Sequence, residues 1–159
     1  MAFSRTVTLR TGLSPEAALA GLSTQVRKGA VFAIDVPRDG VPLRGQIAAD
    51  RFEVVRRTQV RNSFTPIARG RIAAVEGGSE VTVTCSMHVV PMVALACWVI
   101  VGFGLVALIA TDETVPMGLE VVALLALPLA GPLLGFALWR AELDALLADI
   151  TIGITRRDA

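Results

Sequence analysis

Two long uncharged runs decide the fold: VVPMVALACWVIVGFGLVALIAT at residues 89–111 and VVALLALPLAGPLLGFALW at residues 121–139. At about 1.5 Å per residue, the shorter run makes a helix of roughly 28 Å, close to the roughly 30 Å hydrocarbon core of a bilayer. Each Leu, Ile, Val or Phe at a helix centre favours insertion by roughly 0.3–0.6 kcal/mol. The alternative is a buried hairpin in a soluble domain, which would need two helices that are apolar on every face. The sequence therefore predicts a transmembrane helical hairpin.

The hairpin is predicted as a first transmembrane helix, a short external loop and a second transmembrane helix, at residues 91–110, 111–118 and 119–139. Pro128 and Pro132 remove backbone donors from the second helix and predict a kink. Gly131 and Gly135 form a small-xxx-small pattern, which favours packing of the hairpin on itself. No charged residue lies in the middle of either run, which argues against an ion pathway.

Charge is distributed unevenly, although the formal net charge is only +1. Residues 1–88 hold twelve Arg and Lys against seven Asp and Glu, whereas the loop at 111–118 holds two acids and no base. The positive-inside rule therefore places both termini in the cytoplasm. His88, Trp139 and Arg140 are expected at the membrane interface. No secretory signal is visible at the N-terminus, and two cysteines do not suggest a disulfide framework.

Residues 1–90 predict a cytoplasmic α+β domain. A strand at 3–10 is followed by a helix with Ser14 as N-cap and Pro15 at its first position, running to Lys28. Period-two patterns and turn residues then predict strands in an antiparallel β-meander, with the helix on one face; these strands are 31–36, 43–48, 51–58, 64–75 and 80–90. A further cytoplasmic helix at 140–155 carries an apolar stripe, which we expect to pack on this domain; the stripe is Leu143, Leu146, Leu147 and Ile150.

Candidate chemistry is sparse. His88 is the only histidine, without companions at metal-ligand spacing, and no nucleotide-binding or hydrolase motif appears. The sequence therefore predicts a non-catalytic protein with no cofactor. A basic set is the leading candidate contact surface: Arg56, Arg57, Arg61, Arg69 and Arg71. Anionic lipid attracts such residues, whereas the alternative is a solvated strand face with ordinary positive-inside bias. Excess charge and aromatic content are too low to predict nucleic-acid binding.

Several motifs are similar to those of a family of small, uncharacterised bacterial two-span membrane proteins, whose most specific segment is R-N-S-F-x-P before a transmembrane hairpin. The matching positions are Gly45, 51–57 (RFEVVRR), 61–66 (RNSFTP), 70–72 (GRI), 77–79 (GGS) and 87–88 (MH). The resemblance covers roughly residues 40–145. This chain departs from the pattern by placing Val89 and Val90 between His88 and Pro91. The resemblance implies architecture, a bacterial source and hence the inner membrane, and no activity.

The expected function is a membrane-anchored cytoplasmic module that binds a protein partner or anionic lipid headgroups. The bilayer is one partner, and a second protein or further copies of the chain are the others. The alternative is a carrier or sensor of a small apolar ligand or lipid, held in a pocket between sheet and helices, by fold analogy alone. An enzyme would need a polar cleft around His88.

Overall fold

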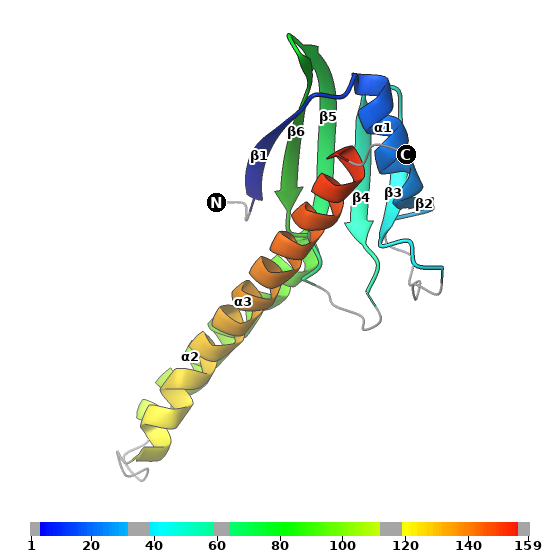
Figure 1. Ribbon diagram of the computed structural model, residues 1–159. Coiled ribbons are helices and arrows are strands. Elements are labelled where there is room, and N and C mark those ends of the chain that lie inside the picture. Colours follow the sequence, from blue (N-terminus) through cyan, green and yellow to red (C-terminus); the bar gives the residue numbers. More distant parts are fainter. Residues whose placement is uncertain (1–3, 32–38, 59–63, 112–118, 156–159) are drawn as a thin grey trace.

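The computed structural model describes residues 4–31, 39–58, 64–111 and 119–155, and it shows an α+β protein with a sheet at one end of a long helical hairpin (Figure 1). The described strands are β1 Ser4–Thr11, β2 Val26–Lys28, β3 Leu43–Ile47, β4 Arg51–Arg56, β5 Ile67–Val75 and β6 Gly78–Ser86. The described helices are α1 Pro15–Thr24, α2 Val89–Ala110 and α3 Leu119–Thr155.

The six strands form one mixed sheet in the order β1-β6-β5-β4-β3-β2. Strands β3 to β6 form the expected antiparallel meander, and β1 pairs antiparallel with β6 at the edge. The purely antiparallel prediction is wrong at the other edge, because β2 runs parallel to β3 with Val26 opposite Leu43. A parallel pair needs a crossover connection of about a dozen residues or more, and residues 29–42 between β2 and β3 are long enough for one.

Helix α1 begins as predicted and ends earlier. Ser14 is the N-cap, its Oγ accepting a hydrogen bond from Ala17 N at 3.3 Å, and Pro15 follows. The helix ends at Thr24 rather than Lys28, because the Thr24 hydroxyl turns back to Gly21 O at 2.8 Å and the β-branched Val26 starts β2. Most of the strand predicted at 31–36 lies outside the described residues.

One face of the sheet is covered by α1 and by the C-terminal half of α3 (Figure 1). Between them lies an apolar core in which every residue is at most 9% exposed. The sheet contributes alternate residues such as Phe52, Val54 and Val83, as strand alternation requires. Helix α3 contributes one face: Trp139, Leu143, Leu146, Ile150 and Ile154.

Strand β6 leads almost directly into α2. The strand predicted at 80–90 ends at Ser86, and α2 starts at Val89 rather than 91. His88 is its N-cap, with Nδ1 accepting from Val90 N at 3.2 Å. Pro91 falls in the first turn, where its missing N–H breaks no intrahelical bond. Strand β5 likewise starts at Ile67 instead of 64, just beyond Pro66, which cannot donate to the ladder.

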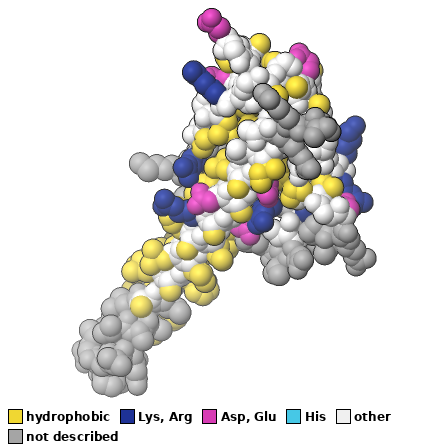
Figure 2. Space-filling model, viewed as in Figure 1, with side chains coloured by type: hydrophobic (Ala, Val, Ile, Leu, Met, Phe, Trp, Pro, Cys, Tyr) yellow, Lys and Arg dark blue, Asp and Glu magenta, His cyan; other side chains and the backbone are white. Residues whose placement is uncertain are grey.

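The predicted second span and the predicted cytoplasmic helix are one continuous helix of 37 residues, with Pro128 and Pro132 inside it. Its first half runs beside α2, and its second half lies on the sheet (Figure 1). Among the described residues, one segment, Val89–Ile109, is long and apolar enough to cross a membrane; its mean hydropathy is 2.7 and none of its most apolar window is buried. Figure 2 shows hydrophobic side chains around the described part of the hairpin and charged ones gathered over the sheet end.

Candidate functional site

The face of the sheet that carries no helix is polar, and we call it the open face. It is made by side chains that alternate with the core residues of β1, β6, β5, β4 and β3. Its exposed and half-buried members include Thr6, Thr8, Arg10, Glu80, Thr82, Thr84, Arg69, Arg71, Ala73, Arg51, Glu53 and Gln46. By register, Arg44, Val55 and Ile67 also belong to this face but are buried. The middle of this face is hollowed, with a volume of about 680 Å³. Arginine, carboxylate and threonine side chains from β4, β5 and β6 line the hollow, together with Gln46 of β3.

Ion pairs organise the charges of the open face. Arg69 donates from Nε and Nη2 to Glu53 Oε1 at 2.9 and 2.8 Å, and Arg10 donates from Nε to Glu80 at 2.9 Å. These side chains are largely solvated, and exposed pairs of this kind contribute roughly 0–1 kcal/mol each. They therefore set the local pattern of charge more than they stabilise the sheet.

Arg51 and Arg71 are the exception to this one-to-one pairing. They lie directly opposite each other across β4 and β5, with side chains 71% and 67% exposed. Both contact the same carboxylate, Asp50, through Nε at 3.5 and 3.0 Å. Like charges opposite one another on a sheet are destabilising, so one Asp50 carboxylate compensates only part of this pair. The hollow consequently carries an excess positive charge at this point.

The structure does not bring the five predicted arginines onto one face. Arg69 and Arg71 lie on the open face, whereas Arg56 lies on the helix side of the sheet. Arg57 is buried, and Arg61 lies outside the described residues. The physical reason is strand alternation, which sends neighbouring residues to opposite faces. The prediction of a single contact surface from these residues is therefore wrong, although two of its members share the hollow.

Arg56 ties the sheet to α3. Its Nε donates to Asp149 at 3.0 Å, and its Nη1 lies 3.6 Å from Glu142. These side chains are only 19–36% exposed, and both acids belong to the polar flank of the helix predicted at 140–155. Arg5 of β1 reaches Asp144 at 3.5 Å on the other side. The two Arg56 contacts hold α3 in register on the sheet, whereas the Arg5–Asp144 pair is 53–64% exposed and contributes roughly 0–1 kcal/mol.

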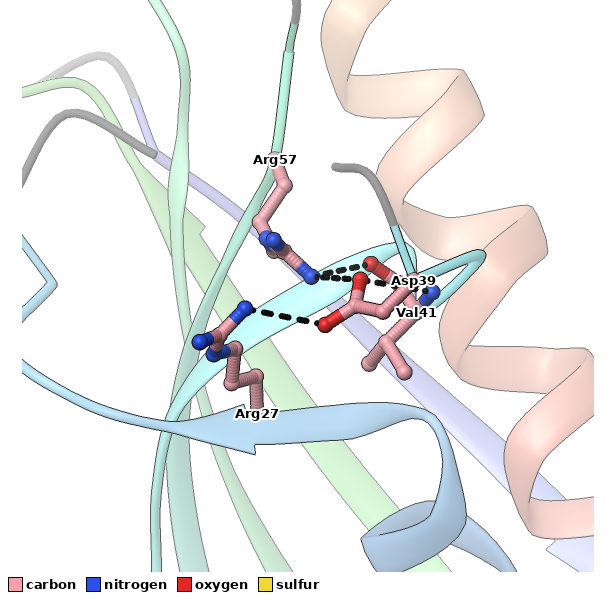
Figure 3. A network of polar contacts seen from close by, with 4 residues as sticks. All are labelled: Arg27, Asp39, Val41 and Arg57. Atoms are coloured by element: carbon pink, nitrogen blue, oxygen red, sulfur yellow. Dashed lines mark hydrogen bonds and ion pairs between the residues drawn. The ribbon is translucent and has the colours of Figure 1, made fainter. Parts of the chain in front are cut away.

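Arg57 belongs to a polar network at the β2–β3–β4 edge (Figure 3). Its side chain is fully buried, and Nη1 donates to Asp39 and to Val41 O. Arg27 pairs with the other Asp39 oxygen at 3.0 Å. The hydrogen bond from Arg57 holds the pKa of Asp39 below its ordinary value of 3.8. Because a buried guanidinium needs such a partner, this network fixes the chain around Asp39 and is structural.

The three predicted interface residues have different positions. His88 lies at the junction of sheet and hairpin, where it caps α2, and Arg140 is exposed on α3. Trp139 is only 6% exposed and belongs to the core, so it cannot anchor in lipid headgroups as predicted. It falls on the same helical stripe as Leu143 and Leu146, which explains its burial.

Gly131 and Gly135 make close contacts within the hairpin. A Cβ on Gly131 would lie 2.8 Å from the Trp98 indole nitrogen of α2. A Cβ on Gly135 would lie 2.9 Å from the ring of Phe64, and that ring comes from the loop between β4 and β5. Each of the two glycines therefore leaves room for one aromatic ring against α3, Trp98 at Gly131 and Phe64 at Gly135. Gly135 thereby joins the sheet domain to the hairpin.

Nothing in the described part of the chain gathers three or more His, Cys, Asp or Glu side chains as metal ligands. Cys85 is buried in β6, and burial raises the pKa of its thiol to about 11. A thiol of this kind is inert at neutral pH.

Comparison of the chain with family models, curated proteins and solved structures gives no match. The candidate site is therefore identified from the geometry of the structure. Sequence reasoning missed Arg51, which it treated only as part of a strand. The signal was present in strand parity, because Arg51, Arg69 and Arg71 share a face once β4 and β5 are paired in register.

Proposed function

We propose that this chain is a membrane-anchored, non-catalytic binding module. In this proposal α2 and the first half of α3 cross the bilayer as a two-span hairpin, with both termini in the cytoplasm of a bacterium. The sheet domain then presents its open face to a protein partner.

The observation that carries the membrane anchor is uncovered apolar surface along the hairpin. Many of its large apolar side chains are 39–71% exposed on both helices, including Ile100, Val101 and Leu108 of α2 and Leu133 and Leu134 of α3. Soluble monomers rarely leave an apolar surface of this size uncovered. Helices α2 and α3 pack along each other. This packing supports insertion of the two helices as one unit, with the second half of α3 remaining on the sheet.

Packing under the helices favours the binding module over the apolar-ligand carrier. A carrier needs an empty apolar space between sheet and helices, but Leu22, Val54, Val83, Leu146 and Ile150 are all fully buried there. The described hollow lies on the opposite, polar face. Its polar lining suits a partner with charged groups.

Orientation is tested by cysteine labelling in intact spheroplasts, in a Cys97→Ser background that keeps the buried Cys85. A membrane-impermeant maleimide should label Thr114→Cys, between the two helices in sequence, before lysis. It should label Glu16→Cys, exposed on α1, only after lysis. Labelling of Glu16→Cys in intact cells, or protection of Thr114→Cys, would refute the proposed topology.

Binding is tested by gentle purification of the full-length protein from its native membrane, followed by mass spectrometry. A stoichiometric protein that is lost with Arg69→Gln/Arg71→Gln but retained with Arg5→Gln/Arg140→Gln supports the module. Recovery of a specific apolar small molecule without a protein would support the carrier instead.

A further inference from the structure

The open face has one point where positive charge is gathered beyond what the chain itself neutralises. Arg51 and Arg71 stand opposite each other with one carboxylate, Asp50, between them. Each of the two arginines contacts the Asp50 carboxylate through its Nε. The side chains of Arg51 and Arg71 are 71% and 67% exposed, so both forks present donors to solvent.

The surroundings of this pair add to its capacity to bind an anion. Thr82 of β6 is the direct neighbour of Arg71, and its hydroxyl is exposed on the same face. All three line the 680 Å³ hollow, together with Gln46 of β3. A guanidinium has five donors in a planar fork that matches a carboxylate or phosphate. The geometry thus presents two forks and a hydroxyl to an oxyanion.

The position of the pair selects between sources of anions. Six residues separate Thr82 from the start of α2, four at the end of β6 followed by Met87 and His88, which is a path of roughly 20 Å at about 3.3 Å per residue. The headgroup layer on each side of a bilayer is only about 5–7 Å deep. A path of this length favours the carboxylates of a soluble or neighbouring protein over the lipid headgroups of the membrane that holds the hairpin in the proposed arrangement.

We propose that Arg51 and Arg71 form a docking point for an acidic segment of a protein partner. Carboxylates of that segment would replace the Asp50 carboxylate that both arginines now contact. This inference rests on the proposed binding function and names its partner chemistry. The existing contacts to Asp50 are exposed and weak, so a partner exchanges them at little cost. Charge complementarity sets both the choice of partner and the rate of encounter.

The test uses the full-length protein in nanodiscs of phosphatidylcholine alone. The probe is a fluorescein-labelled ten-residue peptide of alternating Glu and Ser, followed by fluorescence anisotropy at low salt. Arg51→Gln/Arg71→Gln should weaken binding at least about tenfold, and Arg51→Lys/Arg71→Lys should weaken it at least about threefold because lysine lacks the fork. The matched control, Arg5→Gln/Arg140→Gln, removes the same charge away from the open face and should bind as the wild type does.

Several results would overturn the inference. Failure of the wild type to bind the peptide is one, and equal binding by wild type and Arg51→Gln/Arg71→Gln is another. Competition by inorganic phosphate at concentrations far below those of chloride would assign the forks to a small anion. Binding only to vesicles with added phosphatidylserine would assign them to lipid, and self-association lost in Arg51→Gln/Arg71→Gln would assign them to a second copy.

This test fails separately from the proposed function. If the peptide does not bind but a native partner still copurifies, the forks are not the docking point and the module stands. If the spheroplast labelling gives the wrong orientation, the module fails whatever the peptide does. A thermal midpoint of Arg51→Gln/Arg71→Gln no lower than that of the control variant shows that the folds being compared are the same.

Discussion

Truncating Leu146 to alanine should open the sheet domain, because this side chain comes from α3 and is fully buried in the core with Leu22 and Val54. Leu→Ala changes at such sites cost about 2–5 kcal/mol, from lost transfer energy and the cavity left behind. With tenfold per 1.4 kcal/mol, the equilibrium constant for opening rises about 30-fold to several thousand-fold. Helix propensity does not offset this, because Leu and Ala are both good helix formers.

The assay is the rate at which a thiol reagent modifies Cys85 in a Cys97→Ser background. Cys85 is fully buried and its pKa is about 11, so at pH 8 about one closed-state thiol in a thousand is ionised. Modification therefore proceeds through opened molecules, and its rate follows the opening constant while closing is faster than the reaction. Leu146→Ala should accelerate it by the factor given above.

Ile152→Ala is the matched control, because Ile152 lies on the same helix and is 55% exposed. A surface change of this kind stays within about 0.5 kcal/mol, hence within about threefold in rate. If Cys85 is modified no faster in Leu146→Ala than in Ile152→Ala, the apolar face of the sheet does not depend on packing by Leu146 of α3, and the prediction is refuted.

Three further outcomes follow from the same contacts. Residues 1–88 alone should remain unfolded or aggregate, whereas residues 1–88 joined through a polar linker to 139–155 should give dispersed amide NMR signals, because α3 covers the apolar face. Gly70→Ala should cost about 1–3 kcal/mol by overpacking, since its Cβ would lie 2.1 Å from the Phe52 ring; Cys85 modification measures it, with Gly12→Ala as the control. Asp39→Asn should lower the thermal midpoint at pH 7, and the gap to wild type should close as the pH falls below 3.8, because a lowered pKa gives stability that is lost in acid.

The hairpin and its packing stripe were readable from the sequence because they depend on local periodicity. Uncharged runs of helical length predict α2 and the first half of α3, and residues 143, 146 and 150 repeat at helical spacing. The same spacing includes Trp139, so its burial was predictable and its interfacial assignment overlooked the stripe. The continuity of α3 also agrees with the absence of proline between Pro132 and the end of the helix at Thr155.

The open face was less readable because it depends on pairing between strands. Parity alone separates Arg56 from Arg57 and unites Arg69 with Arg71. The partnership of Arg51 with Arg71, however, requires the register of β4 on β5, and the ten residues between these strands do not specify it. The short parallel strand β2 was missed for a related reason, since three residues after a helix carry too little pattern to identify a strand.

The position of α3 in the sequence also determines when the sheet domain can be completed during synthesis. All six described strands precede residue 87, yet the apolar side of the sheet waits for residues 139–154, which the ribosome delivers after both helices of the hairpin. Contacts of such long sequence separation form late and slowly. During that interval the unfinished sheet exposes hydrophobic surface of the kind that chaperones bind. In the proposed two-span arrangement, a molecule whose hairpin fails to insert correctly does not bring its last helix to the sheet, so completion of the domain would report on the insertion of the hairpin.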